Sequence, residues 1–143
     1  MIIWFDMDGT FVDLYGVPNW CKDLTNKVVT PYKIAKPLFN MNSFARALHK
    51  LQAEGYEIGI ISWLARNSNA EYDKAVEEAK RKWLKTHLKS VQFDYVDIVP
   101  YGTPKHKNRN GFLFDDDFEN RKNWGCECSF DAVDVLETLR LFY

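Results

Sequence analysis

The chain has 143 residues, a formal net charge of −1, and 46% hydrophobic and 27% charged residues. This length suits one domain and is too short for two domains that each bury a core. A near-neutral charge argues against an extended groove for nucleic acid, since proteins with such grooves are usually clearly basic. We therefore expect a single domain over residues 1–143 without an extended nucleic-acid groove.

Nothing in the sequence indicates export or membrane insertion. The apolar start, residues 1–5, lacks a charged n-region and is followed at once by an aspartate. No apolar stretch approaches the length that crosses a bilayer. The three cysteines are an odd number and so make no disulfide framework, and Cys126 and Cys128 lack further zinc ligands nearby. These features predict a cytoplasmic protein with reduced thiols and no membrane partner.

Apolar runs alternate with helical patterns along the chain. Residues 2–5 form an apolar run that is typical of a strand buried on both faces. Residues 11–41 contain three prolines and little periodicity, which predicts a short flap with one helical turn. Apolar residues then recur at helical spacing, so we expect a helix that is capped by Asn42 or Ser43 and ended by Gly55.

A second strand and a long helix follow. Residues 56–62 form the next apolar run, and Ser68 with Glu71 predicts a capping box for a helix that ends near His87. One face of this helix is apolar. Its charged residues are expected to lie on a solvated face: Lys80, Arg81, Lys82 and Lys85.

The last third of the chain continues this alternation. Strands are expected over residues 93–99 and 111–115, with a short one near 126–130, and residues 132–142 predict a final helix. Strands that alternate with helices indicate an α/β fold with a mainly parallel sheet, covered on both sides in a three-layer, Rossmann-like arrangement. In such folds the ligand lies at the carboxyl ends of the strands.

An acidic pair follows the first strand directly, in the sequence Asp6-Met7-Asp8-Gly9-Thr10. Side chains alternate along a strand, so Asp6 and Asp8 are expected to point the same way. Two adjacent carboxylates repel each other, which favours a cation between them. An EF-hand is excluded, because placing Gly9 at loop position 6 puts Trp4 and Tyr15 at the ligand positions 1 and 12.

Polar residues also end the later strands. Ser62 closes the second strand, and its hydroxyl is of the type that donates to a phosphate oxygen. Lys105 precedes the fourth strand and could neutralise an anion there. Asp115 and Asp116 end that strand, with Asn120 shortly after them. An acidic cluster behind an apolar strand is costly without a cation.

Taken in this order, the strand-end residues resemble the four motifs of the haloacid dehalogenase-like (HAD) superfamily of phosphohydrolases. The matching residues span most of the chain and are Asp6-x-Asp8-Gly9-Thr10, Ser62, Lys105, and Asp115-Asp116 with Asn120. The resemblance implies the three-layer α/β/α HAD fold. It also implies a short flap at about residues 11–41, because the chain has no room for a large cap domain.

The resemblance implies covalent catalysis by a phosphomonoester hydrolase. Asp6 would attack phosphorus and become an aspartyl phosphate. Asp8 would protonate the leaving oxygen and then activate water. Lys105 would offset the negative charge of the nucleophile and of the phosphoryl group. Asp8 favours a phosphatase, because dehalogenases lack this second acid.

A magnesium ion is the cofactor that the resemblance implies, held by oxygen ligands. Asp6, Asp8 through its carbonyl, and Asp116 would bind the ion, with Asp115 close by. The groups that would hold the phosphoryl group are Asp8, Gly9, Thr10, Ser62 and Lys105.

The layout is similar to the 5′(3′)-deoxyribonucleotidase branch of the superfamily. This similarity implies a small phosphorylated substrate, and we expect a nucleoside monophosphate. Three aromatic residues near the predicted site are candidates to stack on a nucleobase: Tyr15, Trp20 and Trp63.

Two other functions stay open. One is a polynucleotide end phosphatase, and the other is a catalytically silent binding or regulatory domain with the same fold. A receiver domain of two-component signalling is disfavoured, because its phosphorylated aspartate follows a middle strand whereas Asp6 follows the first. The sequence carries no indication of the oligomeric state.

Overall fold

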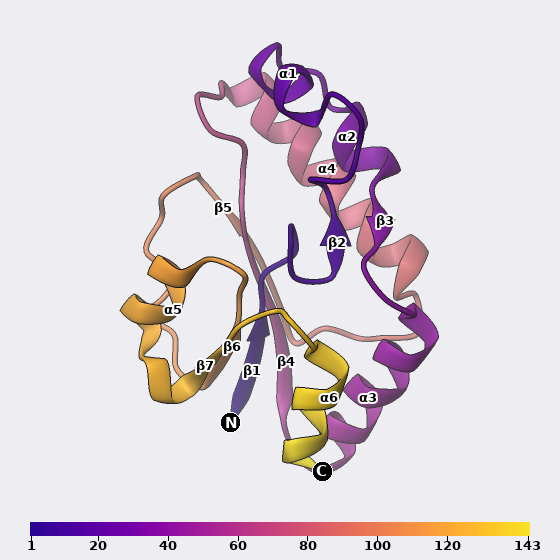
Figure 1. Ribbon diagram of the computed structural model, residues 1–143, viewed down its shortest axis with the longest axis vertical. Coiled ribbons are helices and arrows are strands. Elements are labelled where there is room, and N and C mark those ends of the chain that lie inside the picture. Colours follow the sequence, from indigo (N-terminus) through magenta and orange to yellow (C-terminus); the bar gives the residue numbers. More distant parts are fainter.

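The computed structural model describes all residues, 1–143, and has a parallel sheet at its centre (Figure 1). The five strands lie in the order β5-β4-β1-β6-β7 and all pair in parallel. Their bounds are β1 Ile2–Phe5, β4 Glu57–Trp63, β5 Tyr95–Val99, β6 Phe112–Phe114 and β7 Ser129–Phe130. β1 lies in the middle, so the acidic residues behind it emerge at the centre of the sheet edge.

Three helices cover one face of the sheet: α3 Met41–Ala53, α4 Ala70–His87 and α6 Val135–Leu139, which continues into the 3₁₀ turn η2 Arg140–Phe142. Alternate strand residues such as Ile3 and Phe5 point into this layer and are completely buried. They pack against α3 through Phe44 and Leu48, and against α4 through Trp83. This layer is the main hydrophobic core.

A thinner layer covers the opposite face. It consists of α5 Phe118–Trp124, the 3₁₀ turn η1 Cys126–Cys128 and the irregular segment 100–111. A small cluster of Trp4, Ile61 and Leu113 packs under it. The α/β fold with a three-layer, parallel-sheet arrangement is therefore confirmed, with few helical residues in the third layer.

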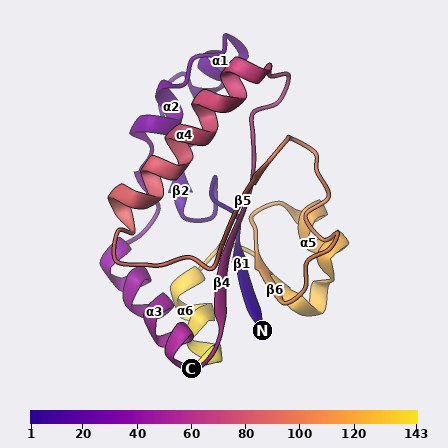
Figure 2. The same cartoon turned by 180° about the vertical axis from the view of Figure 1, so that it is seen from behind.

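The segment predicted to be a flap forms a small unit of its own. It holds the two-stranded sheet of β2 Val12–Asp13 and β3 Lys36–Pro37 and the helices α1 Trp20–Thr25 and α2 Thr30–Ile34. Both helices lie at the end of the molecule toward which β1 runs, and Figure 2 shows α4 beside them. The flap therefore stands over the carboxyl ends of the strands.

Both predicted helix caps were wrong by a few residues. Asn40, rather than Asn42 or Ser43, caps α3, because its side chain accepts a hydrogen bond from the Ser43 amide at 2.9 Å. α4 has no capping box with Ser68. Its cap is Asn69, which accepts from the Tyr72 amide at 2.8 Å.

The expected solvated face of α4 needs one larger correction. Arg81, Lys82 and Lys85 are exposed as expected, whereas Lys80 is 2% exposed and lies in the interior. Lys80 follows Val76 by four positions and precedes Trp83 by three, so it belongs to the apolar stripe of the helix. Its charge is compensated by partners on other elements, which are described with the site.

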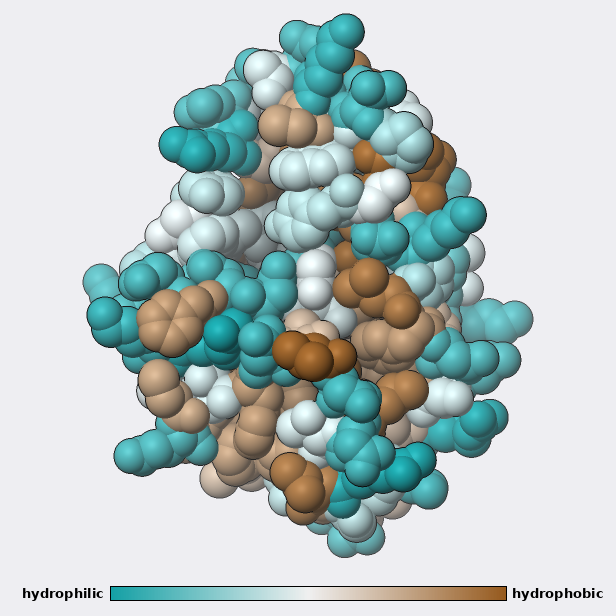
Figure 3. All heavy atoms as spheres, viewed as in Figure 1, coloured by the Kyte–Doolittle hydropathy of each residue, from teal (hydrophilic) through white to brown (hydrophobic).

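The surface carries no broad apolar area on the side shown in Figure 3, where brown atoms form scattered patches among teal ones. The exposed apolar residues come from separate elements, for example Phe118 on α5 and Val133 before α6. Isolated apolar side chains are normal on a protein surface. No helix of the structure is long and apolar enough to cross a membrane.

Phe44 offers a test of the main core. It is completely buried, and its ring lies 5.3 Å from that of Phe5 and 5.2 Å from that of Phe11. We expect Phe44→Ala to lower the free energy of unfolding by about 3–5 kcal/mol in urea denaturation, because it leaves a large cavity. Val133→Ala, at a position 88% exposed, is the control and should change it by less than about 0.5 kcal/mol. A loss below about 1 kcal/mol for Phe44→Ala would contradict this core assignment.

Candidate active site

The loop after β1 turns sharply and places two carboxylates at the sheet edge. The Met7 carbonyl accepts hydrogen bonds from the amides of the three residues 10–12. Gly9 has a φ of 82°, and a Cβ at this position would collide with the Asp116 carboxylate. Glycine therefore lets the loop of β1 approach the acidic end of β6 closely.

Three carboxylates meet at this point. Asp6, Asp115 and Asp116 each offer an oxygen, and these oxygens all lie within 4.8 Å of one another. Asp6 and Asp115 are buried, whereas Asp116 is exposed. The predicted gathering of acidic residues from β1 and β6 is present in the structure.

The crowding changes the ionisation of these groups. Burial, followed by repulsion from Asp6, raises the pKa of Asp116 and of Asp115, and Lys105 opposes the shift at Asp115. Burial also raises the pKa of Asp8, and the positive charge of Lys80 opposes that shift. Without added positive charge, the site therefore resists carrying all of its negative charges at once.

Lys105 supplies part of the positive charge. Its Nζ donates to Asp6 Oδ1 at 3.0 Å and to Asp115 Oδ2 at 2.8 Å, and the side chain is 3% exposed. Burial alone would lower the pKa of Lys105, but the two carboxylates raise it above its ordinary value. Asn120 also donates to Asp115 Oδ2, at 3.2 Å. Lys105 thus contacts both Asp6 and Asp115, and Asn120 contacts Asp115.

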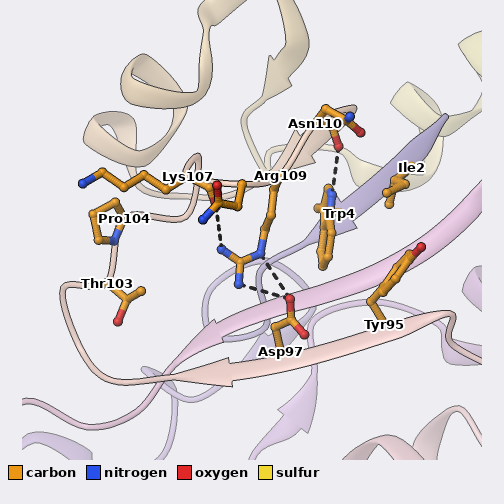
Figure 4. A pocket seen from close by; sticks show the side chains of 10 residues that line it. Ile2, Trp4, Tyr95, Asp97, Thr103, Pro104, Lys107, Arg109 and Asn110 are labelled. Carbon is orange, nitrogen blue, oxygen red and sulfur yellow. Dashed lines mark hydrogen bonds and ion pairs between the residues drawn. The ribbon is translucent and has the colours of Figure 1, made fainter.

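Lys105 lies on an irregular segment that Arg109 fastens to the sheet. The Arg109 guanidinium donates to Asp97 Oδ2 on β5 at 3.1 and 3.2 Å, and to the Lys105 carbonyl at 3.3 Å. It also lies over the Trp4 ring, 5.6 Å from its centroid. Figure 4 shows Arg109, Asp97 and Trp4 around a cavity of about 590 Å³ on the sheet face away from α3 and α4. The pairing of Arg109 with Asp97 was not predicted from the sequence, since only the fold brings these two residues together.

Lys80 is the other buried cation of the site. Its Nζ donates to Asp8 Oδ2 at 2.8 Å, to Ser62 Oγ at 2.7 Å and to the Trp63 carbonyl at 2.9 Å. Sequence reasoning missed it because a lysine on a charged helix usually faces solvent. The signal available was its place in the apolar stripe of α4.

Two of the predicted phosphate-holding hydroxyls are covered. Ser62 is completely buried and does not line the cavity above the site; its hydroxyl accepts from Lys80. Thr10 is also completely buried and donates to Asp6 Oδ2 at 3.3 Å. In this structure both hydroxyls contact the charged groups of the site.

A cavity of about 770 Å³ lies between the flap and the strand ends. Asp6, Asp8 and Lys105 line its floor, and all three aromatic candidates line it as well: Tyr15, Trp20 and Trp63. The Tyr15 and Trp20 rings meet edge to face at 4.9 Å. Trp63 lies 4.9 Å from the Tyr101 ring, and its Nε1 donates to the Thr103 carbonyl at 2.8 Å. The cavity thus joins a charged floor to aromatic walls.

The acidic cluster suits a hard divalent cation. Its donors are carboxylate oxygens, which magnesium prefers, and they come from two strands that hold them in place. Asp116 is the member without a lysine partner, because Lys105 contacts Asp6 and Asp115. A divalent ion beside Asp116 would offset the repulsion that raises the pKa of this group.

Comparison with known proteins gives one informative result. No family model matches the chain, and no curated protein matches it. Among solved structures, D,D-heptose 1,7-bisphosphate phosphatase from Burkholderia thailandensis is similar, with a TM-score of 0.57 and 11% sequence identity. The match covers 99% of this chain and 97% of the other. The chain therefore shares the fold of this phosphatase along its whole length.

The acidic cluster predicts how stability depends on pH. The pKa of Asp116 is raised from 3.8 to about 8, so folding favours its protonated form. The contribution of Asp116 to the free energy of unfolding is complete below pH 3.8 and is lost as the pH rises through about 8. We therefore expect the metal-free protein to melt at a lower temperature at pH 8 than at pH 5. Added Mg²⁺ should raise the melting temperature more at pH 8, because it binds the ionised carboxylates.

Asp116→Asn is the control for this experiment. It removes the titrating group, so both the fall with pH and the gain from Mg²⁺ should shrink. Thermal melts followed by circular dichroism provide the measurement. An equal gain from Mg²⁺ in wild type and variant would contradict the assignment of Asp116 to the metal site.

Proposed function

We propose that this chain is a minimal-cap phosphohydrolase of the HAD-like superfamily that cleaves phosphomonoesters through an aspartyl phosphate on Asp6. The observation that carries the proposal is the meeting of Asp6, Asp8, Lys105 and the acidic end of β6 on the floor of one cavity. The shared fold with a phosphatase agrees with it. Fold alone does not determine function, so the proposal rests on the site.

In the first step an Asp6 carboxylate oxygen forms a bond to phosphorus as the bond to the leaving oxygen breaks. Asp8 gives its proton to the leaving oxygen, which departs as an alcohol. Lys105 stays between Asp6 and Asp115 and attracts the phosphoryl oxygens. Its two contacts keep the nucleophile oriented before substrate enters.

In the second step Asp8, now ionised, takes a proton from water, and the water oxygen bonds to phosphorus. The phosphorus–oxygen bond to Asp6 breaks, which releases phosphate and restores the carboxylate. Asp6, Asp116 and the Asp8 carbonyl would hold Mg²⁺, with Asp115 close by. When bound, the ion stabilises the negative charge of the phosphoryl oxygens and of the nucleophile.

The substrate that we propose is a nucleoside monophosphate. Aromatic rings line the same cavity as Asp6 and Lys105, and stacking of a nucleobase on one ring contributes about 1–3 kcal/mol. Tyr15 lines the cavity and is half exposed, so a nucleobase can reach its ring. This choice follows the layout shared with the 5′(3′)-deoxyribonucleotidase branch.

Three alternatives have distinct consequences. A polynucleotide end phosphatase would prefer a 3′-phosphorylated oligonucleotide over a mononucleotide. A sugar phosphatase would follow the activity named for the structural neighbour, a heptose bisphosphate phosphatase. A catalytically silent domain would turn over none of these compounds.

A substrate panel tests the proposal. With Mg²⁺, the protein is offered nucleoside 5′- and 3′-monophosphates, sugar phosphates and a 3′-phosphorylated oligonucleotide, and phosphate release is measured. We expect the highest kcat/KM on a nucleoside monophosphate, and no turnover after removal of metal with EDTA. Asp6→Asn removes the nucleophile and should lower kcat by about 10⁴-fold or more.

The control variant is Glu78→Gln, which removes a carboxylate from the exposed side of α4. It should keep wild-type kcat and KM. Turnover that survives Asp6→Asn would overturn the covalent mechanism. If the protein prefers the oligonucleotide or a sugar phosphate, that compound replaces the nucleoside monophosphate as the proposed substrate. Inactivity on every compound would favour the catalytically silent domain.

A further inference from the structure

All three N–H groups of the Lys80 ammonium have hydrogen-bond acceptors within the protein. Its three acceptors, on Asp8, Ser62 and the Trp63 carbonyl, all lie within 2.9 Å and use the three N–H bonds of the ammonium group. No donor remains for a substrate phosphate. Lys80 therefore acts on the site through the groups it already holds.

Asp8 is the group that Lys80 fixes at the cavity. Oδ2 accepts the hydrogen bond from Lys80 at 2.8 Å. The side chain is 15% exposed and lines the cavity floor. Asp8 lies only two residues from Asp6, so repulsion would turn an unrestrained Asp8 carboxylate away from it.

Lys80 is closed in from the flap side as well. The Tyr32 ring of α2 lies over Nζ with its centroid at 5.2 Å, and Tyr32 is 5% exposed. Ser62 comes from the end of β4 and is completely buried. Groups from β4 and the flap thus surround Lys80 of α4 and fix the position of its ammonium group.

We propose that Lys80 is the positioning residue for Asp8, acting on proton transfer to the leaving oxygen. This inference rests on the proposed function, in which Asp8 is the acid. A general acid contributes only when it lies within hydrogen-bond reach of the atom it protonates. Misplacing Asp8 should therefore lower kcat/KM for esters of alcohols, whose leaving oxygen needs a proton. It should spare kcat/KM for p-nitrophenyl phosphate, whose leaving group departs as a stable anion. This constant covers the steps up to that departure and not the later attack of water, in which Asp8 also takes part.

Lys80→Met tests the proposal, because methionine keeps much of the volume and loses the charge. Steady-state kinetics with Mg²⁺ compare a nucleoside 5′-monophosphate with p-nitrophenyl phosphate. We expect kcat/KM on the nucleotide to fall about 100-fold, the size of a general-acid contribution. On p-nitrophenyl phosphate kcat/KM should fall less than about fivefold, because its leaving group needs no proton. Lys82→Met, on the exposed face of α4, should match wild type on both.

A double variant keeps the test decisive if Lys80→Met alone folds poorly. Asp8→Asn with Lys80→Met leaves no lone carboxylate beside Ser62, and it should match Asp8→Asn alone within about twofold if Lys80 acts through Asp8. A further loss in the double variant would overturn the proposal. An equal loss of kcat/KM on both substrates in Lys80→Met, with the wild type active, would also overturn it and leave the proposed function standing. An inactive wild type would overturn both.

Discussion

Four carboxylates crowd the carboxyl ends of two neighbouring strands, and the rest of the structure offsets their repulsion. Lys105 holds Asp6 together with Asp115, and Lys80 holds Asp8. Each lysine is almost completely buried, so each ion pair is poorly screened by water. Buried charges are tolerated only when they are paired and hydrogen-bonded. The carboxylates that follow β1 and β6 therefore need the two lysines beside them.

The strand order brings these charged residues together. β1 lies between β4 and β6, so the loop after β1 meets the serine end of β4 and the acidic end of β6. The flap stands over this edge, and α4 lies beside the flap helices α1 and α2. Arg109 ties the segment that carries Lys105 back to β5. The charged floor is thus held by the sheet, by α4 and by one arginine bridge, which leaves the aromatic walls to meet a ligand.

Apolar runs and strong periodicity made the first four strands of the sheet and the long helices α3 and α4 predictable within about two residues. The last strand, expected near 126–130, is only Ser129–Phe130, because residues 126–128 form the 3₁₀ turn η1. The short helix α5 was not predicted, because Phe118–Trp124 has no regular apolar spacing. The motif residues Asp6 and Lys105 were predicted from their order along the chain, which the fold preserves. Lys80 was not, since its burial depends on Asp8 and Ser62, partners far from it in sequence. The local sequence pattern shows which face of a helix a residue lies on. Whether a charge on a buried face is compensated depends on residues that only the fold brings close.

The central claim is that Asp6 is the residue that receives the phosphoryl group. A crystal structure of the protein with Mg²⁺ and beryllium fluoride, a phosphoryl mimic, tests it most directly. The account predicts beryllium bonded to an Asp6 carboxylate oxygen, Lys105 Nζ in contact with fluoride, and Mg²⁺ beside Asp6 and Asp116. Beryllium fluoride bound elsewhere in the cavity, with Asp6 still engaged only by Lys105 and Thr10, would contradict it.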